Sequence, residues 1–249
     1  MIVSIWGNAG SGKSTFAIKL ANSFVRLRKN VILVDANYVA PQTNIWYPNI
    51  NLKKDQSLAV LLDNEIQSAE MVISKITKIS SRLGIVGYAK DYAVNMMSSR
   101  QDTANAFLTT ADDPEICDVI IVDCSTNPLS DIMSFVALND FPSAERLIAL
   151  SPDLRGLSWY DANVKMMEES WNNEGISYTR ILNQTHITSP TADMENAIGK
   201  VSYYLPYDNE IRKELLTGTL GTEAHRTAAR KYTRVVDSIA NDILRKHEQ

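Results

Sequence analysis

Residues 7–15 read GNAGSGKST, and this stretch decides the fold class of the chain. It matches the phosphate-binding pattern G-x-x-x-x-G-K-[ST] at every fixed position, namely Gly7, Gly12, Lys13 and Ser14. Glycines let successive backbone N–H groups turn toward phosphate oxygens, and the following helix adds its positive N-terminal end. The stretch lies between an apolar run at 1–6 and a helical pattern at 14–28, which is the context that the motif requires. It therefore predicts a nucleotide-binding site.

Strand-like and helix-like segments alternate along the whole chain. Apolar runs predict strands at 1–6, 31–34, 83–88 and 118–123, with weaker candidates at 144–150, 178–182 and 200–205. Helical patterns are found at 14–28, 56–63, 65–82 and 98–111, and an amphipathic helix is expected at about 222–246. We expect residues 36–51 to form an ordered surface loop. The alternation predicts an α/β fold with a doubly wound, mostly parallel sheet and helices on both faces, in one P-loop NTPase domain over 1–249.

The composition is that of a soluble globular protein. The 249 residues are 45% apolar and 22% charged, and the net charge of −4 argues against a surface that coats nucleic acid. Cys117 and Cys124 are expected to be buried thiols without a metal. No signal peptide and no apolar stretch of about 18 residues is visible, so we expect a cytoplasmic protein without stable membrane insertion.

The chemistry of the loop assigns roles to particular side chains. Lys13 is expected to reach the β- and γ-phosphates of ATP, Ser14 to bind Mg²⁺, and Thr15 to assist near the α-phosphate. Asp123 ends the buried run VIIVD, so its carboxylate should emerge at the same sheet edge as the loop and hold Mg²⁺. A solvated loop carboxylate is the alternative for Asp123.

The loop also resembles the deviant Walker A motif, K-G-G-x-G-K-[ST], of the ParA/MinD family of positioning ATPases. The resemblance continues in order to about residue 220, through VILVDANYVAPQTNIW (31–46), DVIIVDCSTNPLSD (118–131), AERLIALSPDLRGLSW (144–159), RILNQT (180–185) and VSYYLPYDNE (201–210). It implies an ATP-dependent homodimer that positions a protein partner, here an unidentified one.

The resemblance also implies a set of site residues. The catalytic candidates are Lys13, Asp35 and Asp123, and the Mg²⁺ ligands are Ser14, Asp35 and Asp123. ATP or ADP would be bound by Gly7, Asn8, Ala9, Gly10, Ser11, Gly12, Lys13, Ser14, Thr15, Asn183, Pro206 and Tyr207. For Asn183 an ordinary turn residue is the alternative, and for Pro206 a plain strand terminator.

Two positions depart from the family pattern. Asn8 stands where the family has its signature lysine, and Asn37 stands where switch I has a second aspartate. An amide carries no charge and cannot accept a proton as a carboxylate does. We therefore expect tight ATP binding with slow or partner-stimulated hydrolysis. Atypical loops occur in the CpaE/TadZ-like pilus-assembly branch, although members of that branch usually carry an N-terminal receiver-like domain and this chain starts at the ATPase strand.

Other functions remain as alternatives. One is a nucleotide-gated scaffold without useful turnover. Another is a small-molecule kinase, but the segments where a lid is expected, 84–115 and 184–199, contain only Arg100 as an arginine. Arg226, Arg230 and Arg234 form one basic stripe, but Glu214, Glu223, Asp237 and Asp242 are interspersed among the basic residues late in the chain, so DNA binding is possible but not favoured.

Two further surfaces have alternative interpretations. The aromatic residues at 45–48, with Trp159 and Tyr160, form either a partner surface or packing under a loop. The last helix lacks the bulky apolar tip of a membrane anchor, so packing onto the core is favoured.

Overall fold

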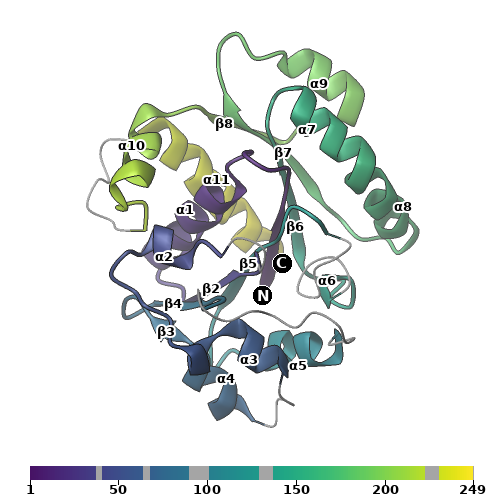
Figure 1. Cartoon of the computed structure of the whole chain (residues 1–249). Helices are drawn as coiled ribbons and strands as arrows, with labels where there is room; N and C mark the ends of the chain where they lie inside the picture. Colours follow the sequence, from purple (N-terminus) through teal and green to yellow (C-terminus); the bar gives the residue numbers. More distant parts are fainter. Residues whose placement is uncertain (38–40, 64–67, 90–100, 129–136, 222–229, 249) are drawn as a thin grey trace.

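The computed structural model describes residues 1–37, 41–63, 68–89, 101–128, 137–221 and 230–248. An eight-stranded sheet runs through its centre in the order β3-β4-β2-β5-β1-β6-β7-β8 (Figure 1). The strands are β1 (Ile2–Trp6), β2 (Val31–Asp35), β3 (Thr77–Lys78), β4 (Leu83–Val86), β5 (Val119–Asp123), β6 (Glu145–Leu150), β7 (Thr179–Thr185) and β8 (Tyr203–Pro206). Among the described strands, only the pair β3–β4 is antiparallel. The predicted doubly wound, mostly parallel sheet is thus confirmed.

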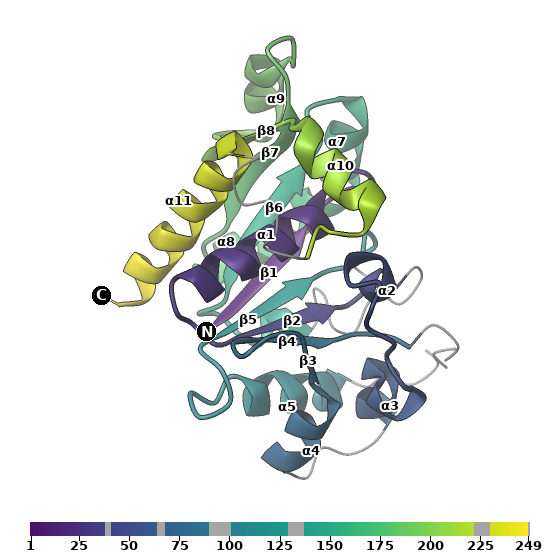
Figure 2. The same cartoon turned by 90° about the vertical axis from the view of Figure 1, so that its left-hand side faces the viewer.

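Helices cover both faces of the sheet (Figures 1 and 2). One face is covered by α1 (Lys13–Arg26), α10 (Asn209–Thr217) and α11 (Arg230–His247), with the short α2 (Thr43–Trp46) beside them. The other face is covered by α3 (Leu58–Asp63), α4 (Ala69–Lys75), α5 (Gln101–Ala111), α6 (Ala137–Asn139), α7 (Leu154–Trp159), α8 (Lys165–Asn173) and α9 (Thr191–Ile198). A short 3₁₀ turn lies at Lys54–Gln56, and a π-helical turn at Tyr160–Val164 joins α7 to α8.

The central strands β1, β2, β4 and β5 are mostly apolar because both faces of the sheet are buried there. Successive side chains of a strand point to opposite faces. In β1, Ile2 and Trp6 accordingly join one hydrophobic cluster, whereas Val3 and Ile5 join the other. Covering both faces with helices requires this near-continuous apolar pattern, which is why the central strands are readable from sequence.

Two expectations differ from the structure. The helix predicted at 65–82 is wrong in its second half, because α4 ends at Lys75 and Thr77–Lys78 form the edge strand β3. The loop predicted at 36–51 contains the helix α2, and it is not simply a surface loop because Trp46 and Tyr47 are buried in the core. The sequence left these aromatic residues as either a partner surface or packing under a loop. The structure shows packing for Trp46, Tyr47 and Tyr160, which are all buried.

The C-terminal helix packs on the core, as favoured. The buried side chains of α11 contact the α1 face of the sheet, and they are Tyr232, Val236, Ile239, Ala240 and Ile243. Residues 98–100 and 222–229, the second range including Arg226, lie outside the described residues. Cys117 and Cys124 are both buried, and neither forms a disulfide among the described residues. Within the described part of the chain, no helix combines the length and the apolar character that crossing a membrane requires.

Candidate functional site

The strand order brings the predicted site residues to one edge of the sheet. β2, β5, β1, β6 and β7 are consecutive and parallel, so their carboxyl ends face the same way. Ligands of open α/β sheets bind at this edge. Asp35 and Asp123 are directly paired between β2 and β5, and the phosphate loop follows β1 in the next position of the sheet.

The backbone of the phosphate loop needs its glycines. Gly10 and Gly12 have φ angles of 75° and 79°, in the left-handed region that glycine adopts without strain. Gly7 has a different requirement, because a Cβ on it would lie 2.0 Å from the carbonyl oxygen of Ala149 in β6. Inside the loop, the backbone N–H of Ser11 donates to the Asn8 carbonyl over 3.1 Å. The loop is thereby folded tightly between β1 and α1.

Lys13 and Asp123 lie at the bottom of the site. Lys13 is only 7% exposed, and its Nζ donates to the Thr126 hydroxyl over 3.2 Å. Asp123 is fully buried, and neither carboxylate oxygen has a hydrogen bond of good geometry among the described residues, although the Ser14 hydroxyl is near. The pKa of Asp123 is raised to about 7, chiefly by burial; the charge of Lys13 opposes this rise, and the nearby carboxylate of Asp35 adds to it. A buried carboxylate of this kind fits a metal ligand.

Asp35 is buried too, but its carboxylate is already engaged. Its Oδ2 accepts from the backbone N–H groups of Gln42 and Thr43, over 2.8 and 2.9 Å, and from the Thr43 hydroxyl over 2.9 Å. Its Oδ1 accepts from the Asn37 backbone N–H over 3.2 Å. Burial raises the pKa of Asp35, and these hydrogen bonds oppose the rise. Asp35 therefore fixes the start of α2 over the site.

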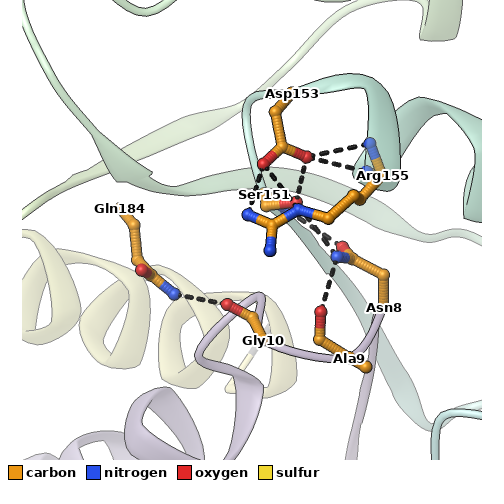
Figure 3. A network of polar contacts seen from close by, with 8 residues as sticks. Asn8, Ala9, Gly10, Ser151, Asp153, Arg155 and Gln184 are labelled. Atoms are coloured by element: carbon orange, nitrogen blue, oxygen red, sulfur yellow. Dashed lines mark hydrogen bonds and ion pairs between the residues drawn. The ribbon is translucent and has the colours of Figure 1, made fainter.

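Ser14 and Thr15 open helix α1 and are both partly buried next to the loop. Asn8 is buried and faces the end of β6. Its Oδ1 accepts from the Ser151 backbone N–H over 3.1 Å, and its Nδ2 donates over 3.0 Å to the Ser151 hydroxyl and to the Ala9 carbonyl (Figure 3). The amide at position 8 therefore joins the phosphate loop to the segment after β6 of its own chain.

A cavity of about 360 Å³ adjoins the other side of the loop. It is lined by Gly10, Gly12, Thr15, Asn183, Gln184, Pro206, Tyr207, Asp208, Ile211, Arg212, Leu215 and Tyr232. The Asn183 amide nitrogen and the Tyr232 hydroxyl lie close together in its wall, yet neither has a hydrogen bond of good geometry among the described residues. The cavity brings together Asn183, Pro206 and Tyr207, which the sequence predicted only as separate motifs.

Several residues of the site were missed at the sequence level. Gln184 has a φ of 61°, and its Nε2 donates to the Gly10 carbonyl over 2.7 Å. His186 stacks on Tyr207 with ring centroids 4.4 Å apart. Thr126 and Ser151 hold Lys13 and Asn8, as described above. Each of these four residues lies within a few positions after the end of a predicted strand. This placement at the ligand-binding edge of the sheet is the signal by which they could have been found.

The residues of the site fit a nucleotide with its magnesium ion. Among the described residues, no three His, Cys, Asp or Glu side chains form a cluster that could hold a metal ion. Mg²⁺ in nucleotide sites, however, takes one or two protein ligands together with phosphate oxygens and water. The buried Asp123 and the neighbouring Ser14 offer that number.

The solved structures that match this chain agree on the fold. No protein-family model and no curated protein matches the sequence. A ParA family ATPase from Chlorobium tepidum TLS superposes with a TM-score of 0.77 at 18% identity, over 96% of this chain and 97% of that one. The septum site-determining protein MinD from Pyrococcus horikoshii OT3, complexed with Mg-ADP, gives 0.74 at 16% identity, over 97% and 95%. A putative plasmid partition protein from Borrelia burgdorferi B31, bound to AMPPNP, gives 0.73 at 15% identity, over 99% and 98%.

The phosphate loop after β1, the buried aspartate at the end of β5 and the sheet order define a P-loop NTPase fold. Within that class, the chain has the fold of the ParA and MinD ATPases along nearly its whole length. At these identities the likeness concerns the fold, and the function is argued from the site itself.

Proposed function

We propose that the protein is an ATP-binding switch of the ParA/MinD type, which dimerises around ATP and Mg²⁺ and positions or organises a partner complex. One observation carries the nucleotide-binding part of the proposal. A phosphate loop with a buried lysine and a buried aspartate at its base adjoins a cavity of about 360 Å³ that contains an unsatisfied amide. The structural neighbours support it, because a MinD with this fold binds Mg-ADP and a plasmid partition protein with this fold binds AMPPNP.

Different residues of the site would bind the phosphates, the base and the magnesium ion. The backbone N–H groups of 7–15 would surround the phosphates, and Lys13 would contact the terminal ones. The base would lie in the cavity, with Asn183 reading its edge and Tyr207 offering a stacking face. Mg²⁺ would be held by Ser14 and Asp123, and when bound it neutralises charge on the phosphate oxygens. Asp35 would act at longer range, since its oxygens already accept hydrogen bonds.

Slow hydrolysis is part of the proposal. Asn8 is held by Ser151 of its own chain, and it brings no charge to the phosphates. Asn37 has an amide in place of a carboxylate, and the carboxylate of Asp35 is occupied in fixing α2. None of these groups is free to take a proton from water, so turnover would depend on a stimulating protein. The same observation favours a second candidate, a nucleotide-gated scaffold without useful turnover.

Solution molar mass under three conditions tests the proposal. We expect a monomer with ADP, a dimer with ATP and Mg²⁺, and a monomer again for Lys13→Ala with ATP. The matched control is Lys165→Ala, because Lys165 at the start of α8 is exposed and paired with Asp161 of the preceding turn. An unchanged mass despite demonstrated ATP binding would contradict the dimerising switch. Turnover that stays absent with candidate partners present would favour the scaffold.

A further inference from the structure

A chain of hydrogen bonds runs from the phosphate loop to an exposed arginine. The Ser151 hydroxyl, which accepts from Asn8 over 3.0 Å, donates to Asp153 Oδ1 over 2.7 Å (Figure 3). Asp153 Oδ2 in turn accepts from Arg155, from Nε over 3.0 Å and from Nη2 over 2.5 Å. Two hydrogen-bonded side chains, Ser151 and Asp153, thereby link Asn8 to the guanidinium of Arg155.

The backbone after β6 is shaped to bring this arginine close to the loop. Asp153 caps α7 by accepting from the backbone N–H groups of Arg155 and Gly156 over 3.0 and 3.1 Å. A Cβ on Gly156 would lie 2.1 Å from the Ser151 carbonyl oxygen, so only glycine permits this tight approach. The segment is therefore built to a fixed geometry.

The remaining nitrogen of the guanidinium faces the phosphate loop. Arg155 Nη1 lies 4.0 Å from the position that a Cβ on Gly10 would take, and it has no hydrogen-bond partner among the described residues. Gly10 is the residue whose carbonyl accepts from Gln184. Gln184 of β7 and Arg155 of α7 thus converge on the tip of the loop, and Arg155 carries a full charge (Figure 3).

An open hollow of about 610 Å³ lies between the arginine and the bottom of the site. Its lining includes Asn8, Ala9, Thr126, Arg155 and Trp159. Thr126 is the residue that holds the Lys13 amine, so the hollow reaches the position expected for the terminal phosphates. An anion that extends from the loop into this hollow would pass between Lys13 and Arg155.

We infer that Arg155 supplies a second positive charge to the terminal phosphate of bound ATP, and that Asn8, Ser151 and Asp153 position it for this. The inference rests on the proposed function. A guanidinium suits the role because it pairs with a carboxylate along one edge and keeps further donors for a phosphate. The contact acts on ATP and not on ADP, which lacks the terminal phosphate. Arg155 therefore makes the site selective for the triphosphate state, a role that the uncharged Asn8 cannot fill.

Calorimetric affinities for AMPPNP and for ADP, each with Mg²⁺, test the inference on the full chain. We expect Arg155→Ala to weaken AMPPNP binding about tenfold to a hundredfold, the range for losing a hydrogen bond between charged groups, and to change ADP binding less than about twofold. The matched control is Arg245→Ala. Arg245 is 70% exposed and paired with Asp242 on α11, and Arg155 is 72% exposed and paired with Asp153. The control should change neither affinity.

The outcomes separate the inference from the proposed function. A wild-type chain that binds neither nucleotide contradicts the proposed function. A wild-type chain that binds both, with the same preference after Arg155→Ala, contradicts the arginine alone.

Discussion

Replacing Asp123 with asparagine should stabilise the free protein and abolish its magnesium-dependent nucleotide binding. The carboxylate of Asp123 is fully buried beside a second buried carboxylate, Asp35, and its attraction to Lys13 only partly compensates. Its pKa is therefore raised from 3.8 to about 7. A carboxyl group with a raised folded-state pKa contributes stability at low pH, and this is lost as the pH rises from the unfolded-state pKa to the folded one.

The raised pKa of Asp123 determines the size of the expected change in the free energy of unfolding. A rise from 3.8 to about 7 corresponds to about 4 kcal/mol between the two protonation states. Asp123→Asn imitates the protonated form at every pH. We therefore expect its free energy of unfolding to exceed that of the wild type by about 4 kcal/mol at about pH 8, and by less than about 1 kcal/mol at about pH 4. Urea denaturation followed by tryptophan fluorescence at several pH values, without nucleotide, measures this difference.

A matched control separates burial from general charge effects. Asp161, whose side chain is 49% exposed and paired with Lys165, provides the variant Asp161→Asn. It should change stability by less than about 1 kcal/mol at any pH. A difference between Asp123→Asn and the wild type that does not grow with pH would refute the reasoning. In the presence of ATP and Mg²⁺, the wild type and Asp161→Asn should both gain stability, whereas Asp123→Asn should not, because it alone lacks the proposed metal ligand.

Two further substitutions test the supports of the site. Thr43→Val removes the hydroxyl that donates to buried Asp35 over 2.9 Å, and should lower the free energy of unfolding by about 1.5–3 kcal/mol in urea denaturation; an unchanged value would show that this bond contributes nothing. Lys19→Met leaves Glu214, 5% exposed, without its ion pair between α1 and α10. This substitution should lower the free energy of unfolding by about 3–5 kcal/mol, and a loss below about 1 kcal/mol would contradict the reasoning. It should also weaken ATP and ADP binding alike, because α10 lines the cavity proposed for the base.

The parts of the fold that were predicted depend on local patterns. The central strands were predicted because burial on both faces makes each one a continuous apolar run, and the loop at 7–15 because its glycines and lysine have fixed spacing. The helix at 65–82 was predicted wrongly in its second half. There the pairing of Thr77–Lys78 with β4 outweighed the local preference for helix. Packing against a neighbour decides such short edge segments.

The site could be predicted only as separate motifs. Asn8 was recognised by its place in the loop, but its partner Ser151 lies 143 positions away and carries no pattern of its own. Asp35 was predicted as a magnesium ligand and a catalytic residue, which stays a prediction. The structure adds that Gln42 and Thr43 donate hydrogen bonds to its Oδ2. The cavity beside the phosphate loop is lined by residues of β7, β8, α10 and α11, and no local spacing indicates that these segments meet.

The sequence by itself determined the class of fold, the phosphate loop and the acid at the end of β5, because each depends on neighbouring residues that must be apolar, flexible or charged together. Only the tertiary structure decided that Asn8 binds its own chain, that Asp35 fixes α2, and that Arg155 reaches the loop. These contacts join the ends of different strands. Strand order and crossover geometry bring those ends together, and the order of strands in a sheet is not the order of residues in the chain.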